Sequence, residues 1–348
     1  MEGVEFVSPG AALLGFFGLA GLLALLFWPG RGLVPRWLLS RWRTERVLLE
    51  DALKYLHNCE YGGRSCNIDG IAEGLGLSAE RAEVLVGSLA GRGLCELSEG
   101  RLALTRAGRS YALRVLRRHR LWERYLADRT GLPAGEWHEE AERVEHTLTP
   151  AQVEVLAAQL GNPIYDPHGD PIPSVDGRVP PAEGVVLTKM GAGEVGVVVH
   201  LEDEPREVYE RLVTGGLGPG MPVEVVGRDA DAVQILAGGV EHELEPAAAR
   251  SVTVRPGVAA GVGMRDLVPL TALGAGETGV VAGIVGSCQG PQRRRLLDLG
   301  VVPGTRVTAE LFGVSGDPVA YRIRGALIAL RREQADWIRV RSEAEEDS

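Results

Sequence analysis

The sequence is poor in cysteine and in aromatic residues. Its 348 residues include four cysteines, and phenylalanine, tryptophan and tyrosine together make up 5%. The cysteines lack the paired spacing of a zinc site. Their small number argues against a disulfide framework, which is consistent with a reducing compartment. We therefore expect each to be a small buried residue; they are Cys59, Cys66, Cys95 and Cys288.

Charged residues are absent from one N-terminal stretch, residues 7–30, of which 11–28 is almost wholly apolar. That length is just sufficient to cross a hydrocarbon core of about 30 Å, so residues 1–30 are predicted to form a single transmembrane anchor. Glu2 and Glu5 precede the stretch, whereas arginines follow it in the basic juxtamembrane segment 31–45. The positive-inside tendency then places the rest of the chain on the cytoplasmic face of the cell membrane. A cleaved signal peptide is disfavoured because the basic residues follow the apolar run.

Nothing in the composition indicates disorder. Hydrophobic residues make up 45% and charged residues 24%, with a net charge of −10. The length predicts several domains. We expect the fold to be multidomain α+β, with a winged helix-turn-helix domain at 46–108, a helical metal-binding and dimerisation domain at 109–173, a Gly/Pro-rich connector and linker ending with 174–184, two small β domains at 185–256 and 264–341, and an acidic tail at 342–348.

Helical patterns at 46–58, 68–74 and 78–91 are followed by two alternating segments, 94–97 and 101–104. Three helices and a hairpin in this order are typical of a winged helix-turn-helix. Arginines without an intervening acid run from Arg101 to Arg120, which favours phosphate contact over a solvated basic face. Glu80 and Glu83 near the start of the recognition helix argue against sequence-specific contact. The candidate DNA-contacting residues are Ser78, Arg81, Ser88, Arg92, Arg101 and Arg106.

Histidines and glutamates gather on two predicted helices. His119 and Glu123 are four residues apart on one of them, and the run 138–146 follows on the next. At 3.6 residues per turn, four residues of this run share one stripe: His138, Glu142, Glu145 and His146. Imidazole and carboxylate ligands without thiolate suit iron, manganese, zinc or cobalt better than calcium. The alternative is a solvated acidic helix with incidental histidines, which six ligand-type residues on compatible faces make less favoured.

The C-terminal half contains an internal repeat. Residues 211–220 match 295–304, and residues 249–254 match 335–340. Each copy contains alternating strands with a short helix before a Gly/Pro turn, which predicts a small SH3-like barrel.

These motifs together resemble a known family. Residues 46–173 resemble the diphtheria toxin repressor and manganese transport regulator family, through Arg-His-Arg-Leu-Trp-Glu at 118–123, His-Glu-Glu-Ala-Glu-Arg-Val-Glu-His at 138–146, and the Gly-Asn-Pro…Pro-His-Gly-Asp-Pro-Ile-Pro segment at 161–173. Both repeats, the second more clearly, resemble FeoA-type SH3-like domains through 294–300, Pro303-Gly304 and 316–321.

The resemblance implies metal ligands. His119, Glu123 and His138 would form an ancillary site, and Glu142, Glu145 and His146 would belong to a primary site. Glu50 is the best match to a ligand from the first helix, while Val47 stands where the family has a second ligand, so that water or Asp51 would fill the position. A carboxylate that some relatives supply from the SH3-like domain has no evident counterpart. The implied cofactor is Fe(II) or Mn(II).

The leading functional hypothesis is a membrane-tethered, metal-dependent transcriptional regulator, a repressor of metal-uptake genes. It would bind an inverted-repeat operator as a homodimer after metal fixes the angle between paired winged helices. The alternative is a tethered metal-sensing adaptor whose FeoA-like domains contact an iron transporter without specific DNA binding. An enzyme is not expected, because no nucleophile arrangement is present and the Gly-x-Gly-x-x-Gly segment at 191–196 precedes a strand rather than a helix.

Overall fold

A computed structural model describes residues 33–181, 183–229, 231–257 and 266–343, and the side chains of 33–44 and 343 are left out of the description. The chain divides into two compact units, Met1–Val115 and Leu116–Ser348. The predicted anchor at 7–30 lies outside the described residues. Within the part that is described, no helix is both long enough and apolar enough to cross a membrane.

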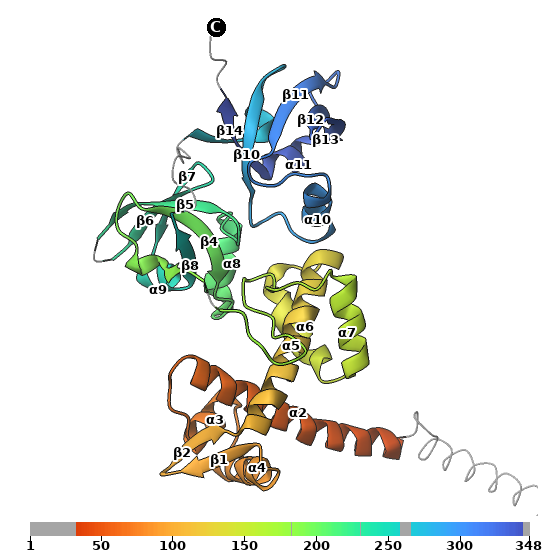
Figure 1. The fold of residues 1–348 in the computed structure, drawn as a ribbon, viewed down its shortest axis with the longest axis vertical. Coiled ribbons are helices and arrows are strands. Elements are labelled where there is room, and N and C mark those ends of the chain that lie inside the picture. The colour runs from red at the N-terminus through yellow and green to blue at the C-terminus, as the bar shows by residue number, and fades with distance from the viewer. Residues whose placement is uncertain (1–32, 182, 230, 258–265, 344–348) are drawn as a thin grey trace, which may run out of the picture. The chain divides into compact units, whose positions relative to one another are not determined.

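The first unit contains the elements of the predicted winged helix-turn-helix (Figure 1). In chain order they are α2 (Leu33–Tyr61), α3 (Ile68–Gly74), α4 (Ala79–Gly91), β1 (Cys95–Ser98), β2 (Arg101–Leu104) and the start of α5 (Arg106–Arg129). Strands β1 and β2 pair antiparallel, with Cys95 opposite Leu104. Helix α2 begins well before the predicted start at residue 46, so part of the basic segment 31–45 is helical.

Local signals in the sequence explain these helices. The side chains of Asn67 and Ser78 cap α3 and α4 by accepting hydrogen bonds from the backbone N–H groups of Gly70 and Arg81. Helix α3 approaches α2 closely at Gly74. A Cβ at this position would lie 2.4 Å from the Tyr55 ring, so a larger residue would not fit without a shift. The helices then share one buried core, which includes Leu53, Leu56, Ile71, Leu85 and Leu89.

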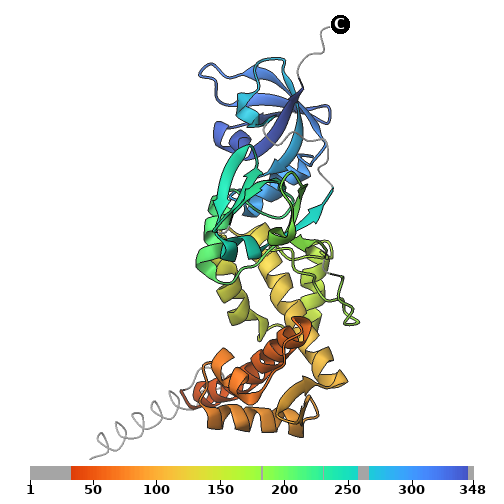
Figure 2. The same cartoon turned by 90° about the vertical axis from the view of Figure 1, so that its left-hand side faces the viewer.

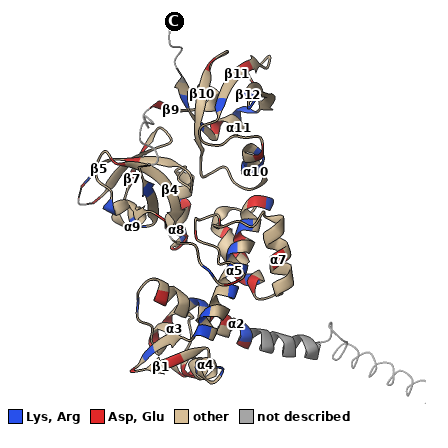
Figure 3. Ribbon diagram, in the orientation of Figure 1, with Lys and Arg blue, Asp and Glu red and all other residues tan. Residues whose placement is uncertain are grey.

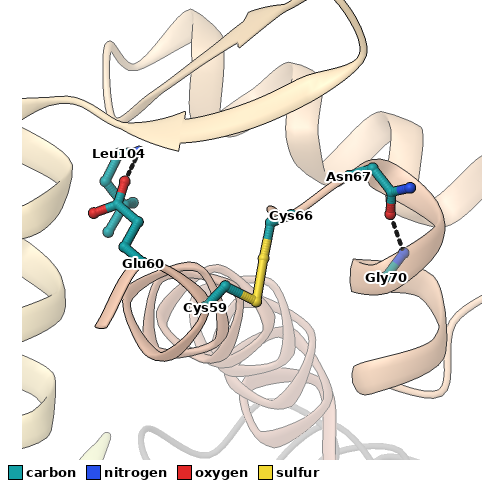
Figure 4. The surroundings of a disulfide bond; sticks show 6 residues. All are labelled: Cys59, Glu60, Cys66, Asn67, Gly70 and Leu104. Carbon is teal, nitrogen blue, oxygen red and sulfur yellow. Dashed lines mark hydrogen bonds between the residues drawn. A yellow bond between two sulfur atoms is a disulfide. The ribbon is translucent and has the colours of Figure 1, made fainter. Parts of the chain in front are cut away.

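Cys59 and Cys66 are buried as predicted, but the expectation that they form no disulfide is wrong. Cys59 and Cys66 form a disulfide, with an S–S distance of 2.22 Å (Figure 4). The loop after α2 turns back, so that the two Cα atoms lie 6.2 Å apart, within the range for a disulfide. The carbonyl of Cys66 also accepts a hydrogen bond from the N–H of Leu102 in the wing. Sequence spacing alone does not show this turn. Cys95 and Cys288 are buried thiols, as predicted.

This disulfide gives a simple expected result. The unfolded, unreduced chain should expose two thiols to a thiol-reactive dye, those of Cys95 and Cys288, and four after reduction. After reduction, the Cys59→Ser and Cys66→Ser variants should each show three reactive thiols. Four reactive thiols before reduction would show that the bond is absent in the purified protein.

The second unit begins with helices. They are the remainder of α5, a 3₁₀ turn at Ala134–Glu136, α6 (Trp137–Glu145) and α7 (Pro150–Gln159). Helix α7 begins with a capping box in which Thr149 and Gln152 exchange hydrogen bonds, and Pro150 occupies its first position. Leu121 of α5 packs on Val153, Leu156 and Leu160, which joins α5 to α7.

Two antiparallel six-stranded sheets form the rest of the second unit (Figures 1 and 2). The elements of the first repeat are β3 (Val185–Val186), β4 (Val195–Leu201), α8 (Arg206–Thr214), β5 (Pro222–Arg228), β6 (Val233–Ala237), β7 (Val240–Leu244), α9 (Pro246–Arg250) and β8 (Val252–Pro256). Those of the second are β9 (Leu267–Pro269), β10 (Thr278–Ile284), α10 (Gly290–Asp298), β11 (Arg306–Phe312), β12 (Val319–Ile323), β13 (Ala326–Leu330), α11 (Arg332–Asp336) and β14 (Ile338–Glu343).

The two sheets have the same strand order, β3-β8-β4-β5-β6-β7 and β9-β14-β10-β11-β12-β13. They also share irregularities: the register shifts between Val225 and Gly227 in one sheet, and between Ala309 and Leu311 in the other. The two repeats predicted from the sequence therefore have the same fold. The alternating pattern predicts three strands in each repeat, at 194–200, 222–226 and 233–236 and at 276–282, 305–310 and 320–324, and all six are present. Strands β3, β7, β8, β9, β13 and β14 were not predicted.

Candidate metal centre

Two helices of the second unit bring together the histidines and glutamates singled out by the sequence. His119 and Glu123 lie one turn apart on α5, and both are buried. Helix α6 supplies His138 and Glu145. The turn between the helices is held in part by Trp137, whose indole N–H donates a hydrogen bond to the carbonyl of Leu132.

His119, Glu123 and His138 form the tightest cluster. The Nε2 atom of His119 lies 3.0 Å from Oε1 of Glu123 and 3.3 Å from Nδ1 of His138. The same Nδ1 lies 3.4 Å from Oε1 of Glu123. One ligand atom from each residue thus faces the others within 4.8 Å, which is the arrangement that a bound cation requires.

Glu145 orients His119 from the other side. Its Oε2 atom lies 2.6 Å from Nδ1 of His119, and its Oε1 atom lies 3.3 Å from Nε2 of His146. A proton on Nδ1 donated to this fully buried carboxylate leaves Nε2 of His119 to face the cluster in its ligand form.

Glu142 lies apart from the cluster. Its side chain is 51% exposed, and its Oε1 atom lies 3.6 Å from Nε2 of His138, the ring nitrogen opposite the one that faces Glu123. The helical stripe predicted from spacing therefore divides: Glu145 points inward and Glu142 lies at the surface.

Two residues that the sequence did not identify as ligands complete the arrangement. His168 and Asp203 form a second group of potential ligands with Glu123. Nε2 of His168 lies 3.9 Å from Oε1 of Glu123, and Oδ2 of Asp203 lies 3.1 Å from Nδ1 of His138. Glu123 is common to both groups. Asp203 also supplies, from the first repeat, a carboxylate of the kind that the resemblance implied and the sequence could not locate.

The loop that carries His168 is held from two sides. The Asp166 carboxylate accepts hydrogen bonds from the backbone N–H groups of His168, Gly169 and Asp170. The carbonyl of His168 accepts a hydrogen bond from the N–H of Leu201 in β4. The His168 ring packs between those of Trp137 and Tyr209, at centroid distances of 5.7 and 5.0 Å.

His168 is 2% exposed, and neither of its ring nitrogens has a hydrogen-bond partner among the residues that the structure describes. A buried polar group without a partner costs free energy, so its retention indicates a ligand that the protein itself does not provide. Because Nε2 points toward Glu123, the residues present fit a divalent transition metal.

Electrostatics also favour a cation at this place. Burial alone would lower the pKa of His138, but its contacts with Asp203, Glu123 and Glu142 outweigh burial and raise the pKa to about 12. Burial would raise the pKa of Glu123, yet the neighbouring histidines hold it well below its usual value. The pKa of Asp203 is lowered too, since the contact with His138 outweighs burial. Because these buried carboxylates stay ionised, they stabilise the protonated form of His138, and that positive charge takes the place of a metal ion's charge.

Glu50, the ligand expected from the first helix, belongs to the first unit. It is fully buried, its Oε1 atom accepts a hydrogen bond from the Tyr111 hydroxyl at 2.7 Å, and Arg46 lies 3.0 Å away.

The candidate DNA-contacting residues lie around α4 and the wing. Ser78 caps α4, and Arg92 at its end donates a hydrogen bond to Ser88. Arg81, Arg101 and Arg106 are exposed. Figure 3 shows how lysine and arginine residues are distributed along the ribbon. Val84 on α4 is 74% exposed, an apolar residue that is not among the DNA contacts predicted from the sequence.

A winged helix and a buried imidazole and carboxylate cluster in one chain define the class: a transcriptional regulator that responds to a metal ion. Residues 105–174 match the family described as iron dependent repressor, metal binding and dimerisation domain. Residues 185–256 and 268–342 each match the FeoA domain.

Individual proteins agree with these matches. The chain is 35% identical over 190 residues to the iron-dependent repressor IdeR of Mycobacterium leprae, covering 51% of this chain and 82% of that protein. It is 30% identical over 173 residues to the diphtheria toxin repressor of Corynebacterium diphtheriae, covering 46% and 75%. A solved manganese-dependent transcriptional repressor in complex with manganese is 30% identical, with a TM-score of 0.56, over 60% of this chain and 99% of the other. The chain belongs to the iron-dependent repressor family. Because these relatives are repressors, the adaptor hypothesis is not favoured.

Proposed function

We propose that this protein is a transcriptional repressor that binds DNA as a dimer when Fe(II) or Mn(II) occupies the cluster around Glu123. The observation that carries this proposal is the buried, unpartnered His168 ring beside Glu123, where His119, His138 and Asp203 also meet. Mixed imidazole and carboxylate donors without thiolate suit these two metals.

The cluster residues come from separate parts of the second unit. His119 and Glu123 belong to α5, His138 to α6, His168 to the loop before the first repeat, and Asp203 to the first repeat itself. A divalent ion would supply the positive charge that His138 holds as a proton without it. If the metal binds only when these segments bring their ligands together, it stabilises that conformation in proportion to the difference between its affinities for the two conformations.

Dimerisation would use an apolar groove on the helical part of the second unit. The groove lies between α5 and α7, and its lining includes Trp122, Tyr125, Leu148, Ala151, Val155 and Leu156. Apolar surface of this kind is typical of contacts between subunits. A dimer would present two copies of α4 to the two halves of an inverted-repeat operator.

Operator selection from random-sequence DNA, followed by gel shift with the full-length protein in mild detergent, tests the proposal. We expect a shift with Fe(II) or Mn(II) that a chelator abolishes. The double variant Arg101→Glu with Arg106→Glu should lose the shift, since reversal of phosphate-contacting charge opposes binding, while Arg250→Glu in the first repeat serves as the control. A shift that is independent of metal, or no selected sequence at all, contradicts the proposal.

Metal binding should release protons, because His138 must lose its proton to become a ligand. With a pKa of about 12 in the metal-free protein, His138 is protonated at neutral pH. Each released proton makes the affinity for metal rise about tenfold per pH unit below that pKa. Titration calorimetry in buffers of different ionisation enthalpy should therefore show release of about one proton per ion near pH 7, and His138→Ala should remove that release.

We propose further that residues 7–30 hold the protein at the cytoplasmic face of the cell membrane. The support is the uncharged apolar run and the arginines that follow it. In cell fractionation, the full-length chain should sediment with membranes and resist extraction with high salt, whereas a chain beginning at residue 31 should not. Equal distribution of the two forms contradicts the proposal.

A further inference from the structure

Each FeoA repeat ends its sheet with a five-residue edge strand in the same position. In the first repeat this strand is β7 and in the second it is β13; among the described strands, β7 pairs with β6 alone and β13 with β12 alone. An edge strand presents unpaired backbone N–H and C=O groups to solvent, and natural proteins commonly block such edges with charged residues.

The two edges differ in how they are protected. Strand β7 reads Val-Glu-His-Glu-Leu and carries exposed Glu241 and Glu243. Strand β13 reads Ala-Leu-Ile-Ala-Leu, without any charge, and Leu327 within it is 47% exposed. The second repeat thus lacks, at an equivalent position, the device that protects the first.

One row of side chains on the sheet beside β13 is apolar as well. Leu311, Ala320 and Ala329 lie opposite one another across β11, β12 and β13, and Leu311 is 59% exposed. The equivalent row in the first repeat is polar: Gly227, Gln234 and Glu243. An exposed apolar row beside an uncharged edge strand indicates a surface that becomes covered.

The charges around the two edges are complementary. Exposed Arg324 and Arg331 flank β13 on its two sides. On β7 and just after it, Glu241, Glu243 and Glu245 are all exposed. An edge flanked by arginines next to apolar residues fits an extended strand that carries glutamates, and β7 is such a strand.

We propose that β13 of one copy of the protein pairs with β7 of a second copy and so joins their sheets. In an antiparallel pairing centred on Ile328 and His242, the inward residues of both strands stay on the same face, and Arg331 lies diagonal to Glu241, within reach of its long side chain. This contact is heterologous, so it adds assembly beyond a two-fold dimer. It goes beyond the proposed function, since none of its residues belongs to the metal cluster or to the groove between α5 and α7.

Sedimentation of the full-length, metal-loaded protein in detergent tests the contact. We expect the wild type to associate beyond the dimer with increasing concentration. Leu327→Glu should raise the dissociation constant of that step about tenfold or more, because it places a negative charge opposite Glu243 in the proposed pairing. Val175→Glu makes the same kind of change at another exposed apolar residue and should have no effect. A wild type that remains dimeric, or equal association of Leu327→Glu, overturns the proposal.

Charge reversal identifies the partner strand. Glu241→Arg and Arg331→Glu should each weaken association, whereas the double variant should recover it, because the opposite charges meet again. An equimolar mixture of the two single variants should also recover it, since Arg331 of one variant then meets Glu241 of the other. No recovery in the double variant overturns the assignment of β7 as the partner. Metal affinity and the dimer itself should stay unchanged throughout, which separates failure of this contact from failure of the proposed function.

Discussion

Glu123→Gln is expected to weaken binding of Mn(II) by about 100-fold, equivalent to about 2.7 kcal/mol. Among the described residues, Glu123 is the only residue that belongs to two groups of potential ligands, one with His119 and His138 and the other with His168 and Asp203. The substitution preserves the shape of the side chain but removes a buried negative charge that faces three histidines. A neutral amide compensates neither the metal charge nor a protonated imidazole, so the loss is electrostatic rather than steric.

Glu142→Gln is the matched control. Glu142 is the same kind of residue on a helix of the same centre, but it is half-exposed and lies beside the other nitrogen of His138. Solvent screens its charge, so we expect a change of about threefold or less. Calorimetric titration, together with circular dichroism to verify folding, compares the two variants. Equal losses would mean that the ion lies nearer to Glu142, in the arrangement that helical spacing alone predicted.

The sequence was informative about this centre wherever its ligands lie on one helix. His119 and Glu123 could be paired because helical periodicity fixes the relation of residues four apart. The same periodicity could not distinguish Glu142 from Glu145, since both lie within one broad stripe. Which of them is buried depends on the neighbouring α5, because Glu145 contacts His119 of that helix.

Ligands on loops could not be deduced in this way. His168 follows Pro167 in a connector, and Asp203 stands within the acidic run 202–204 after β4. No local period relates either of them to α5. Their positions result from the pairing of the loop backbone with β4, a contact between segments remote in sequence. The acidic run was a usable signal, and the search for a carboxylate in the first repeat could have begun there.

In the winged helix and the repeats, too, local features could be predicted from the sequence, whereas contacts between distant segments could not. Caps and hairpin alternation revealed the elements at 68–104, because these signals are local. The disulfide was missed since it depends on how the chain folds back after α2. Strands β7 and β13 were missed as well, although their neighbours were predicted, because an edge strand has one partner and a weaker burial pattern.

Gly169→Ala is expected to disrupt the metal centre without changing any ligand. Gly169 has a φ of 99°, and a Cβ there would lie 1.9 Å from the carbonyl oxygen of Val199 and 2.8 Å from Cα of His200. These are backbone atoms of β4 that no side-chain rotation can move. The loop must therefore shift away from the strand, and with it His168, whose carbonyl is bonded to Leu201. We expect a loss of about 3 kcal/mol in the free energy of unfolding and a clear loss of metal affinity.

Gly161→Ala separates the two causes of that loss. Gly161 also has a positive φ, 79°, but an added Cβ would meet no atom within 4 Å. Its cost is limited to backbone strain, about 1 kcal/mol, and metal affinity should be unchanged. Urea unfolding of the metal-free variants and titration with Mn(II) measure both quantities. If Gly169→Ala resembled Gly161→Ala in both, the loop would not need its close contact with β4, and His168 would reach Glu123 by some other support. If Gly169→Ala lost stability alone, His168 would not be a ligand, because its displacement would then leave metal binding intact.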